Sequence, residues 1–234
     1  MKIDAQAGGL YFGSSGSQGY RLVLRTDDTF NLYRVNTLQS LPSGCTNTAG
    51  QTGWGSWSTN STTLLGNYPF PANGLIFLAD HVWVEGTINT ARLKIVAARI
   101  PDDNASLRKS ITVNNNVTYT NYDGTDVVAL IGQNDVNVGM ISADTLRIDA
   151  ALVAQNGRVG RYYYESDCNP YDKRNTITLY GTLVTALRYG FAYTDGTGYL
   201  IRNIIYDSFL LYNPPPFFPK TDDFHEVISW KEVE

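Results

Sequence analysis

The sequence is poor in charge, in cysteine and in histidine. Charged residues make up 17% of its 234 residues, whereas soluble globular domains have about 25%. Asn, Thr, Ser, Gln, Gly and Tyr must therefore cover the surface, as is typical of secreted and surface-exposed β proteins. The only histidines are His81 and His225, so a metal site built on the two cysteines would need other ligands. We predict no metal site and no cofactor.

Long basic runs, long apolar runs and helical periodicity are also missing. The net charge is −4, and no Lys/Arg run exceeds two residues, which argues against strong attraction to nucleic acid. A local basic groove could still contact DNA, because several arginines, Arg158 and Arg161 among them, fall within one third of the chain. No run approaches the ~18 apolar residues of a membrane-spanning helix. No apolar leader follows Met1, so no signal peptide is visible.

The two cysteines, Cys45 and Cys168, both lie in loop-like sequence rich in Gly, Asn, Thr and Pro. A buried structural thiol usually sits in an apolar run. A lone pair in loops is compatible with a disulfide formed in an oxidising compartment, or with two unrelated thiols. The residues alone leave both interpretations open.

What the chain does contain is strand signals. Residues 21–25 and 30–35 alternate with period two around the turn sequence TDDT, which predicts a β-hairpin over residues 20–35. Residues 36–63 lack a strand pattern and are predicted to form a long surface loop. Trp54 and Trp57 in that loop are candidate binding residues. They form either an aromatic contact surface or, the interpretation we favour, a cover for an open end of the core.

An internal echo gives the strongest information on architecture. ALIGQN at residues 129–134 returns as ALVAQN at residues 151–156, 22 positions later. Repetition of a short apolar run within one chain indicates a structural unit that stacks on its neighbour. The retained Gln-Asn suggests stacked amide ladders.

A longer motif has the form apolar, any, apolar, any, small, small, apolar. It begins at residues 82, 111, 146 and 177, with Asn in the small positions of the second copy. Alternate apolar residues direct one strand face inward, and a small residue permits a tight corner. We therefore predict an all-β protein whose central part, residues 68–212, is a right-handed parallel β-solenoid, also called a β-helix. An ordinary β-sandwich is the alternative. The 22-residue echo is shorter than the motif spacing, so one circuit is shortened or the echoes lie on different walls.

The two ends of the chain complete the predicted organisation. Residues 1–67 hold the N-terminal β-hairpin and the long loop. Residues 213–234 begin with NPPPFFP, and consecutive prolines cannot join a sheet interior. We predict that this Pro-rich C-terminal segment is a capping strap followed by a last strand over residues 226–230. Its alternative is an exposed Pro-rich ligand.

Several of these segments resemble a known family. The segments are VWVEGT at 82–87, ALVAQNG at 151–157, ITLYG at 177–181, and the tail YNPPPFFP at 212–219 followed by ISW at 228–230. Over residues 68–234 the chain resembles the extracellular part of bacterial type IV pilus-associated proteins of the large minor-pilin kind. The tail motif carries more of this resemblance than the repeat motifs do.

The resemblance implies a β-helical ectodomain on a pilin-like stem, located outside the bacterial cell at its surface. It implies an N-terminal hydrophobic helix that packs into the pilus core and provides the only membrane contact. That helix is missing here, and we expect it ahead of residue 1. The hairpin at residues 20–35 would then belong to the pilin-type sheet. The resemblance brings no catalytic residues with it.

Catalysis has one candidate arrangement. Glu85, Asp149 and Tyr180 occupy the same motif position, and in a solenoid they would stack on one wall. The interpretation we favour is that they are solvent-facing polar positions on a strand. Asp102, Asp103 and Asn104 could ligate Ca²⁺, but their spacing is not that of an EF-hand. We predict a non-enzymatic surface module without catalytic residues, whose partners are other pilus subunits, a surface glycan or DNA during uptake. A carbohydrate-active β-helix enzyme and a self-assembling solenoid scaffold are the alternatives.

Overall fold

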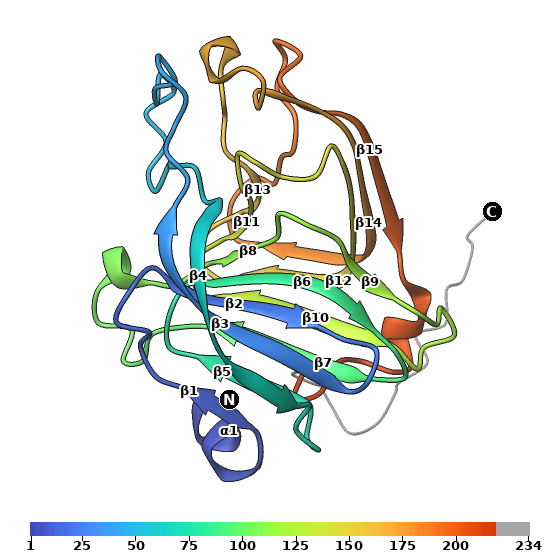
Figure 1. Cartoon of the computed structure of the whole chain (residues 1–234). Coiled ribbons are helices and arrows are strands. Elements are labelled where there is room, and N and C mark those ends of the chain that lie inside the picture. The colour runs from blue at the N-terminus through green and yellow to red at the C-terminus, as the bar shows by residue number, and fades with distance from the viewer. Residues whose placement is uncertain (219–234) are drawn as a thin grey trace, which may run out of the picture.

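Parallel pairing of short strands organises the computed structural model, which describes residues 1–218 (Figure 1). The predicted all-β class is confirmed, with one short helix and three single 3₁₀ turns added to the strands. The elements in chain order are α1 (Lys2–Gly8), β1 (Leu10–Phe12), β2 (Gly19–Leu24), β3 (Thr29–Leu38), β4 (Thr59–Pro69), β5 (Leu75–Leu78), β6 (Val82–Ile88), β7 (Arg92–Ala97), η1 (Ala105–Leu107), β8 (Ile111–Thr112), β9 (Val117–Tyr119), β10 (Val127–Gly132), β11 (Val136–Val138), β12 (Thr145–Ala154), β13 (Val159–Arg161), η2 (Ser166–Cys168), β14 (Lys173–Thr185), β15 (Gly198–Tyr206) and η3 (Ser208–Leu211).

The parallel strands fall into three rows, and hydrogen bonds join neighbours within each row. The first row is β1, β5, β7, β10 and the ends of β12 and β14. The second row is β2, the start of β6, β8, β11 and β13. The third row is the end of β6, β9, the starts of β12 and β14, and β15. From β5 onward the chain visits the rows in this same order on each circuit.

The echo marks two neighbouring strands of one row. Residues 129–132 of β10 pair in parallel with residues 151–154 of β12, so that Ala129 faces Ala151 and Leu130 faces Leu152. The 22-residue offset is therefore the length of one short circuit, which leaves the first row at β10 and returns to it at the end of β12. The predicted amide ladder does not form. The Gln133 side chain bonds the main chain of Arg99 through both of its polar atoms, while Gln155 is exposed.

The longer motif is in full register at one of its three steps and only at its start at another, where Val117 lies opposite Gly86 rather than Ile88. Val82 pairs with Ile111, and Leu146 pairs with Ile177. The step from residue 111 to residue 146 is wrong, because Ile111 lies in the second row opposite Val136. β6 runs from the second row into the third without a break, and β12 runs from the third row into the first. In the next circuit after β6, the path from the second row to the third is divided at a corner into β8 and β9. A motif defined by spacing alone cannot distinguish these cases.

Small residues do allow the predicted corners. Gly86 and Gly181 have φ angles of 114° and 150°, which side chains rarely tolerate. A Cβ atom on Gly86 would collide with the carbonyl oxygen of Leu24, and one on Gly181 with that of Ala150. The neighbouring strand therefore approaches too closely for any other residue.

Strands of all three rows contribute to one apolar core. Alternate residues of each strand point into it, as in β2, where Tyr20, Leu22 and Leu24 are buried. The same core takes in residues of both early and late strands, from Phe30 on β3 to Leu179 on β14. Its continuity along the rows means that each strand depends on the next for burial.

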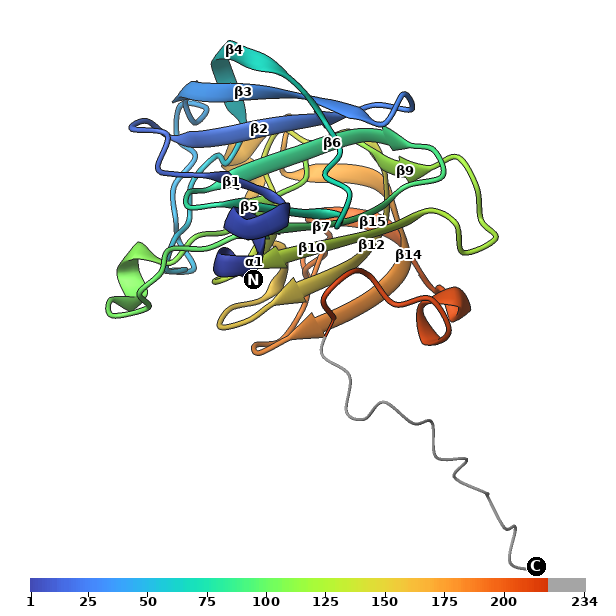
Figure 2. The ribbon, with the colours of Figure 1, turned by 90° about the horizontal axis from the view of Figure 1, so that it is seen from below.

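An antiparallel hairpin closes the N-terminal end of the rows. The hairpin predicted over residues 20–35 is confirmed, with β2 and β3 paired from Gly19 opposite Val35. β4 pairs antiparallel to β3 and forms the outermost strand of that end (Figure 2). The loop predicted over residues 36–63 is shorter than expected, because β3 and β4 extend into it and leave residues 39–58. Polar side-chain pairs such as Thr37 with Ser61 join the two extensions, so alternation of apolar residues could not reveal them.

The described part of the Pro-rich segment lies on the outer flank of the first row rather than over an end. Arg92 and Lys94 of β7 donate hydrogen bonds to the carbonyl oxygens of Pro214 and Phe217, each at 2.6 Å. Phe218 packs with α1 against apolar residues that point outward from β5, β7 and β10. The described residues of the strap, up to residue 218, therefore do not cover the C-terminal end of the rows. The strand predicted over residues 226–230 lies outside the described residues.

Candidate functional site: an arginine-lined cleft at the open end of the rows

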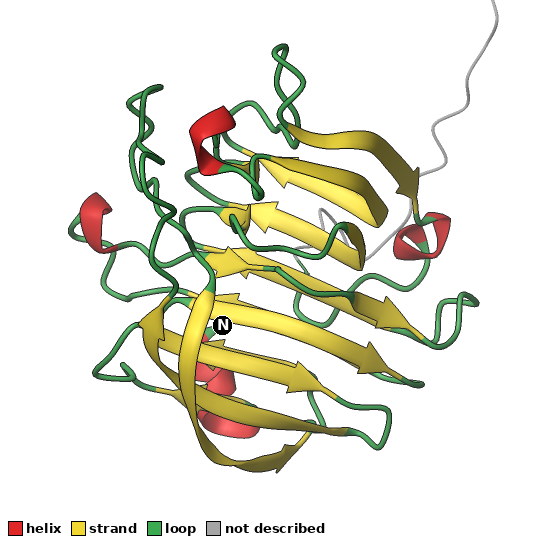
Figure 3. Ribbon diagram, turned by 45° about the horizontal axis from the view of Figure 1, so that its top comes forward, coloured by secondary structure: helices red, strands yellow, loops and turns green. Residues whose placement is uncertain are grey.

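β15 is the last strand of the third row, and β14 is its only strand partner among residues 1–218 (Figure 3). After Gly198 and Tyr199, which are buried, every residue of the strand is exposed. Five of them are large and apolar, with exposed fractions between 46% and 58%: Leu200, Ile201, Ile204, Ile205 and Tyr206. Such an edge presents main-chain donors and acceptors beside apolar side chains, although the carbonyl oxygens of Tyr199 and Leu200 accept hydrogen bonds from Arg202.

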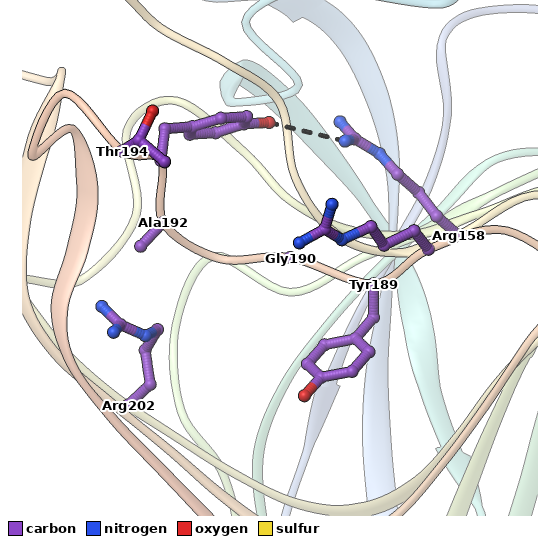
Figure 4. Close-up of a pocket in the computed structure, with 8 residues that line it drawn as sticks. Arg158, Tyr189, Gly190, Ala192, Thr194 and Arg202 are labelled. Carbon is purple, nitrogen blue, oxygen red and sulfur yellow. Dashed lines mark hydrogen bonds between the residues drawn. The ribbon is translucent and has the colours of Figure 1, made fainter.

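A cleft of about 640 Å³ lies between β15 and the preceding segment, residues 188–194 (Figure 4). Its lining residues are Arg158, Arg188, Tyr189, Gly190, Ala192, Tyr193, Thr194 and Arg202. A second hollow adjoins it and brings in Phe191 and Ile204, an apolar residue of the exposed strand. The cleft is thus the side of the core that a further strand circuit would have filled.

Three arginines give this cleft its charge. None of Arg158, Arg188 and Arg202 belongs to any of the ion pairs found among residues 1–218. Arg202 donates to the carbonyl oxygen of Tyr199 at 2.8 Å, and that bond leaves its charge uncompensated. Arginine presents several donors in a planar fork, which suits carboxylate and phosphate groups. The cleft therefore favours an anionic partner.

Arg158 is the best anchored of the three. Its guanidinium lies 4.7 Å from the centre of the Tyr162 ring and 3.4 Å from the hydroxyl of Tyr193. Its main-chain N–H donates to Asp135 at 2.8 Å. Burial raises the pKa of the Asp135 carboxyl, and the N–H and the charge of Arg158 oppose that shift. Arg158 thus joins the cleft to the interior.

Tyr193 and its neighbours hold the outer wall of the cleft. The hydroxyl of Tyr193 donates to the carbonyl oxygen of Arg161 at 2.8 Å, and its ring meets Tyr163 edge-on at 4.9 Å. Tyr163 in turn donates to Asp195 at 2.7 Å, which raises the pKa of the Tyr163 phenol. Hydrogen bonds from Thr197 lower the pKa of Asp195. These contacts fix the turn that leads into β15.

The predicted binding residues separate in the structure. Arg158 lines the cleft, but Arg161 is fully buried and lies beneath it. The guanidinium of Arg161 donates to the carbonyl oxygens of Met140 and Tyr171, at 3.0 and 2.5 Å, and burial lowers its pKa to about 10. No surface ligand can reach it, so its role is structural. Its burial could not be inferred from its nearness to Arg158 in the sequence. The two residues are three positions apart, and an odd offset along an extended chain places side chains on opposite faces.

The tryptophans and cysteines form a separate brace. Cys45 and Cys168 are joined by a disulfide that ties loop 39–58 to η2. Trp54 packs on Tyr164 and donates to the carbonyl oxygen of Tyr163, while Trp57 packs on Trp83. Both rings thus lie against the protein and cover a small apolar cluster. The brace reaches the cleft through Gln51 in the same loop, whose side chain accepts from the Tyr163 N–H at 2.7 Å.

The carboxylates considered for catalysis are in structural use and do not stack together. Asp149 faces Tyr180 as expected, but Gly86 lies opposite Val117 and Val117 opposite Ile148, which moves Glu85 out of line with Asp149. Glu85 pairs with Arg21, and the buried Asp149 pairs with Arg147 at 2.9 Å and accepts from Tyr122 at 2.6 Å.

The acidic loop considered for Ca²⁺ is also satisfied internally. Asp102 pairs with Arg108 at 2.9 Å, Asp103 with Arg99 at 2.5 Å, and Asn104 caps η1. Over the described part of the chain, no three His, Cys, Asp or Glu residues are grouped so as to hold a metal ion. Nor does any helix in residues 1–218 have the length and apolar character needed to cross a membrane.

Comparison with known proteins adds no relative: no family model, no curated protein and no solved structure matches the chain.

Sequence reasoning missed Arg188, Arg202, Tyr189 and Tyr193. One available signal was the strand pattern of residues 199–206, YLIRNIIY, which follows the last motif copy and has no later copy to pair with. An apolar strand at the end of a repeat series needs a cover. The arginine within it could then have been assigned to the uncovered end.

Proposed function

We propose that the three rows are the walls of a right-handed parallel β-solenoid. The constant order in which the chain visits the rows supports this, as do the glycine corners and the single core that all rows share. Right-handed crossover between parallel strands is the general rule.

The module works without catalysis, and it binds a partner polypeptide at its open end. The observation that carries this proposal is β15, a nine-residue edge strand with five exposed large apolar residues. Strand addition to such an edge gains main-chain hydrogen bonds, while side-chain pockets give specificity. Arg158, Arg188 and Arg202 beside it select a partner strand that carries carboxylates.

The setting that fits this work is the outside of a bacterial cell, where the partner is another pilus subunit. The pilus setting rests on the resemblance of the repeat and tail segments. An exported location agrees with the Cys45–Cys168 disulfide, since disulfides persist in oxidising compartments.

The test measures binding of a soluble peptide of alternating Glu and Val by the full chain. We expect a double variant, Ile201→Lys with Ile205→Lys, to weaken binding at least tenfold, because added charge blocks strand pairing. Leu64→Lys, on the exposed edge strand at the other end, is the matched control and should bind as the natural sequence does. Equal binding by all three proteins, or no binding by any, would refute the proposal.

A second candidate function is binding of an acidic glycan or of DNA in the cleft, favoured by the combination of three arginines with Tyr189 and Tyr193. Phosphate contacts would make affinity fall steeply with salt. In that case Arg188→Gln and Arg202→Gln would abolish binding, while the lysine double variant on β15 would strengthen it. A carbohydrate-active enzyme would release new sugar ends from a glycan panel and lose that activity in Asp149→Asn.

A further inference from the structure

We infer that the strand added to β15 is the acidic C-terminal segment of a second copy of this chain, residues 222–234. The inference rests on the proposed function and names its partner. It would join molecules head to tail, since the donor segment and the acceptor strand are different parts of the chain.

The first argument is that β15 is not protected against pairing. Natural edge strands are usually blunted by Lys, Pro, bulges or a cover. β15 contains neither Lys nor Pro, and Arg202 is its only charged residue. At the opposite end, β4 has an edge rich in Thr, Asn and Ser, and its pairing with β3 is interrupted by register shifts. One end is thus built to stop strand pairing and the other to continue it.

The second argument is the chemistry of the segment. Residues 222–234, DDFHEVISWKEVE, carry five carboxylate side chains and one lysine, with Phe224, Val227, Ile228, Trp230 and Val233 among them. The pattern predicts a strand over residues 226–230. No other stretch of the sequence combines this acidity with so many large apolar residues. It matches an apolar edge flanked by arginines.

The third argument is charge. Arg158, Arg188 and Arg202 have no carboxylate partner among the described residues. A strand added beside β15 would lie within reach of the cleft that they line. Carboxylates on that strand would form charge-assisted hydrogen bonds with the guanidinium groups. The same groups would repel a basic strand.

The last argument concerns which copy supplies the segment. After β15 the strap runs away from this end, and Phe217 is bound by Lys94 on β7. β7 is three strand positions before β14 in the first row, about 14 Å at the usual strand spacing. The five residue steps from Phe217 to residue 222 span at most about 18 Å, which covers that distance along the row, but β15 lies in a different row. A chain would therefore have to reverse and turn a corner to lay residue 222 on its own β15, whereas a second copy meets no such limit.

The experiment follows the mass of the full chain by sedimentation as its concentration rises to about 100 µM, well above a micromolar dissociation constant. We expect species heavier than the 25.9 kDa monomer. Arg188→Glu with Arg202→Glu should raise the apparent dissociation constant at least tenfold, as should Asp222→Lys with Asp223→Lys and Glu226→Lys. Combining both sets should restore association, because the charges are then exchanged. Arg25→Glu, an exposed arginine in the hairpin turn, is the control.

Circular dichroism and thermal unfolding establish that each variant is folded. A monomer at every concentration would overturn the inference, and so would a failure of the charge exchange to restore association. Hydrogen exchange separates the remaining case: protection of residues 226–230 in a monomer would mean that the chain binds its own segment. If the Glu-Val peptide still binds β15 while the chain stays monomeric, the proposed function stands and only the named partner is wrong.

Discussion

The edge strands at the two ends of the rows differ in whether they are protected against pairing with another strand. At the N-terminal end, β3 and β4 fold back as an antiparallel hairpin, and the outermost strand is polar and irregularly paired. At the C-terminal end, β15 stops with an apolar, regular edge beside three arginines that form no ion pair within residues 1–218. A row of parallel strands can thus be closed by the chain itself or left open for another chain. This difference is the basis on which we propose that the C-terminal end binds the partner.

The largest effect that we expect concerns the link between the ends. Loop 39–58 leaves the hairpin of the closed end, and its Cys45 is bonded to Cys168 beside the open end. Opening a loop of 123 residues should cost about 5 kcal/mol of unfolding free energy. Urea unfolding of the Cys45→Ser, Cys168→Ser double variant measures this. A loss below about 1 kcal/mol would mean that the loop does not brace the open end.

Next in size is substitution at the two corners. Gly86→Ala and Gly181→Ala should each cost about 3 kcal/mol, because φ is positive and a carbonyl oxygen occupies the site of the new methyl group. Both glycines have strand partners on both sides, so the two costs should be similar. Gly190→Ala is the control, since its Cβ would meet nothing within 4 Å. Denaturant unfolding compares the three; equal losses would remove the corner argument.

A smaller effect depends on pH and concerns the closed end. Burial lowers the pKa of His81, beside Trp57, to about 4. The unfolded chain, with a histidine pKa near 6.5, then binds more protons than the folded chain between pH 4 and 6.5. Unfolding free energy should therefore fall as the pH is lowered through this window, by roughly 2 kcal/mol after allowance for partial solvent access. His81→Asn should remove that part of the slope, and an unchanged slope would contradict the assignment.

The smallest effects should distinguish folding from binding. Ile205→Lys on β15 and Leu64→Lys on β4 both alter exposed side chains, so each should change unfolding free energy by less than about 0.5 kcal/mol. Thermal unfolding of dilute protein provides the measurement. A large loss in Ile205→Lys alone would show that the β15 edge is part of the folded core rather than a free surface.

The sequence allowed the class of fold and the repeated strand to be predicted, for a physical reason. Strands of one row share the same neighbours and the same core, so Ala129–Leu130 and Ala151–Leu152 came to look alike. The alignment failed at Ile111 because corners can be inserted without altering the apolar alternation. The end of β3 and the start of β4 were not predicted, because polar cross-strand pairs rather than alternating apolar residues stabilise them.

The site was less predictable than the fold. Arg158 was predicted as a binding residue, but Arg188 and Arg202 could be assigned to the cleft only because no strand of residues 1–218 lies beyond β15. Arg161 looks like its neighbour in the sequence and lies on the other side of the strand. Trp54 and Trp57 could have faced outward, and only the tertiary contacts of loop 39–58 turn them inward. A site made by the end of a repeat leaves no motif of its own.

The disulfide has a consequence for a protein under tension. If the chain is pulled from its two ends, the covalent bond between Cys45 and Cys168 carries the force past everything between them. The enclosed residues, which include most of the strands of all three rows, could not be drawn out. About 40 nm of contour length would be withheld at 3.3–3.6 Å per residue. Only α1, β1 to β3 and the strands after η2 would unfold. A stretched molecule would keep the strands between the two cysteines, β4 to β13, while β15 at the C-terminal end unfolded.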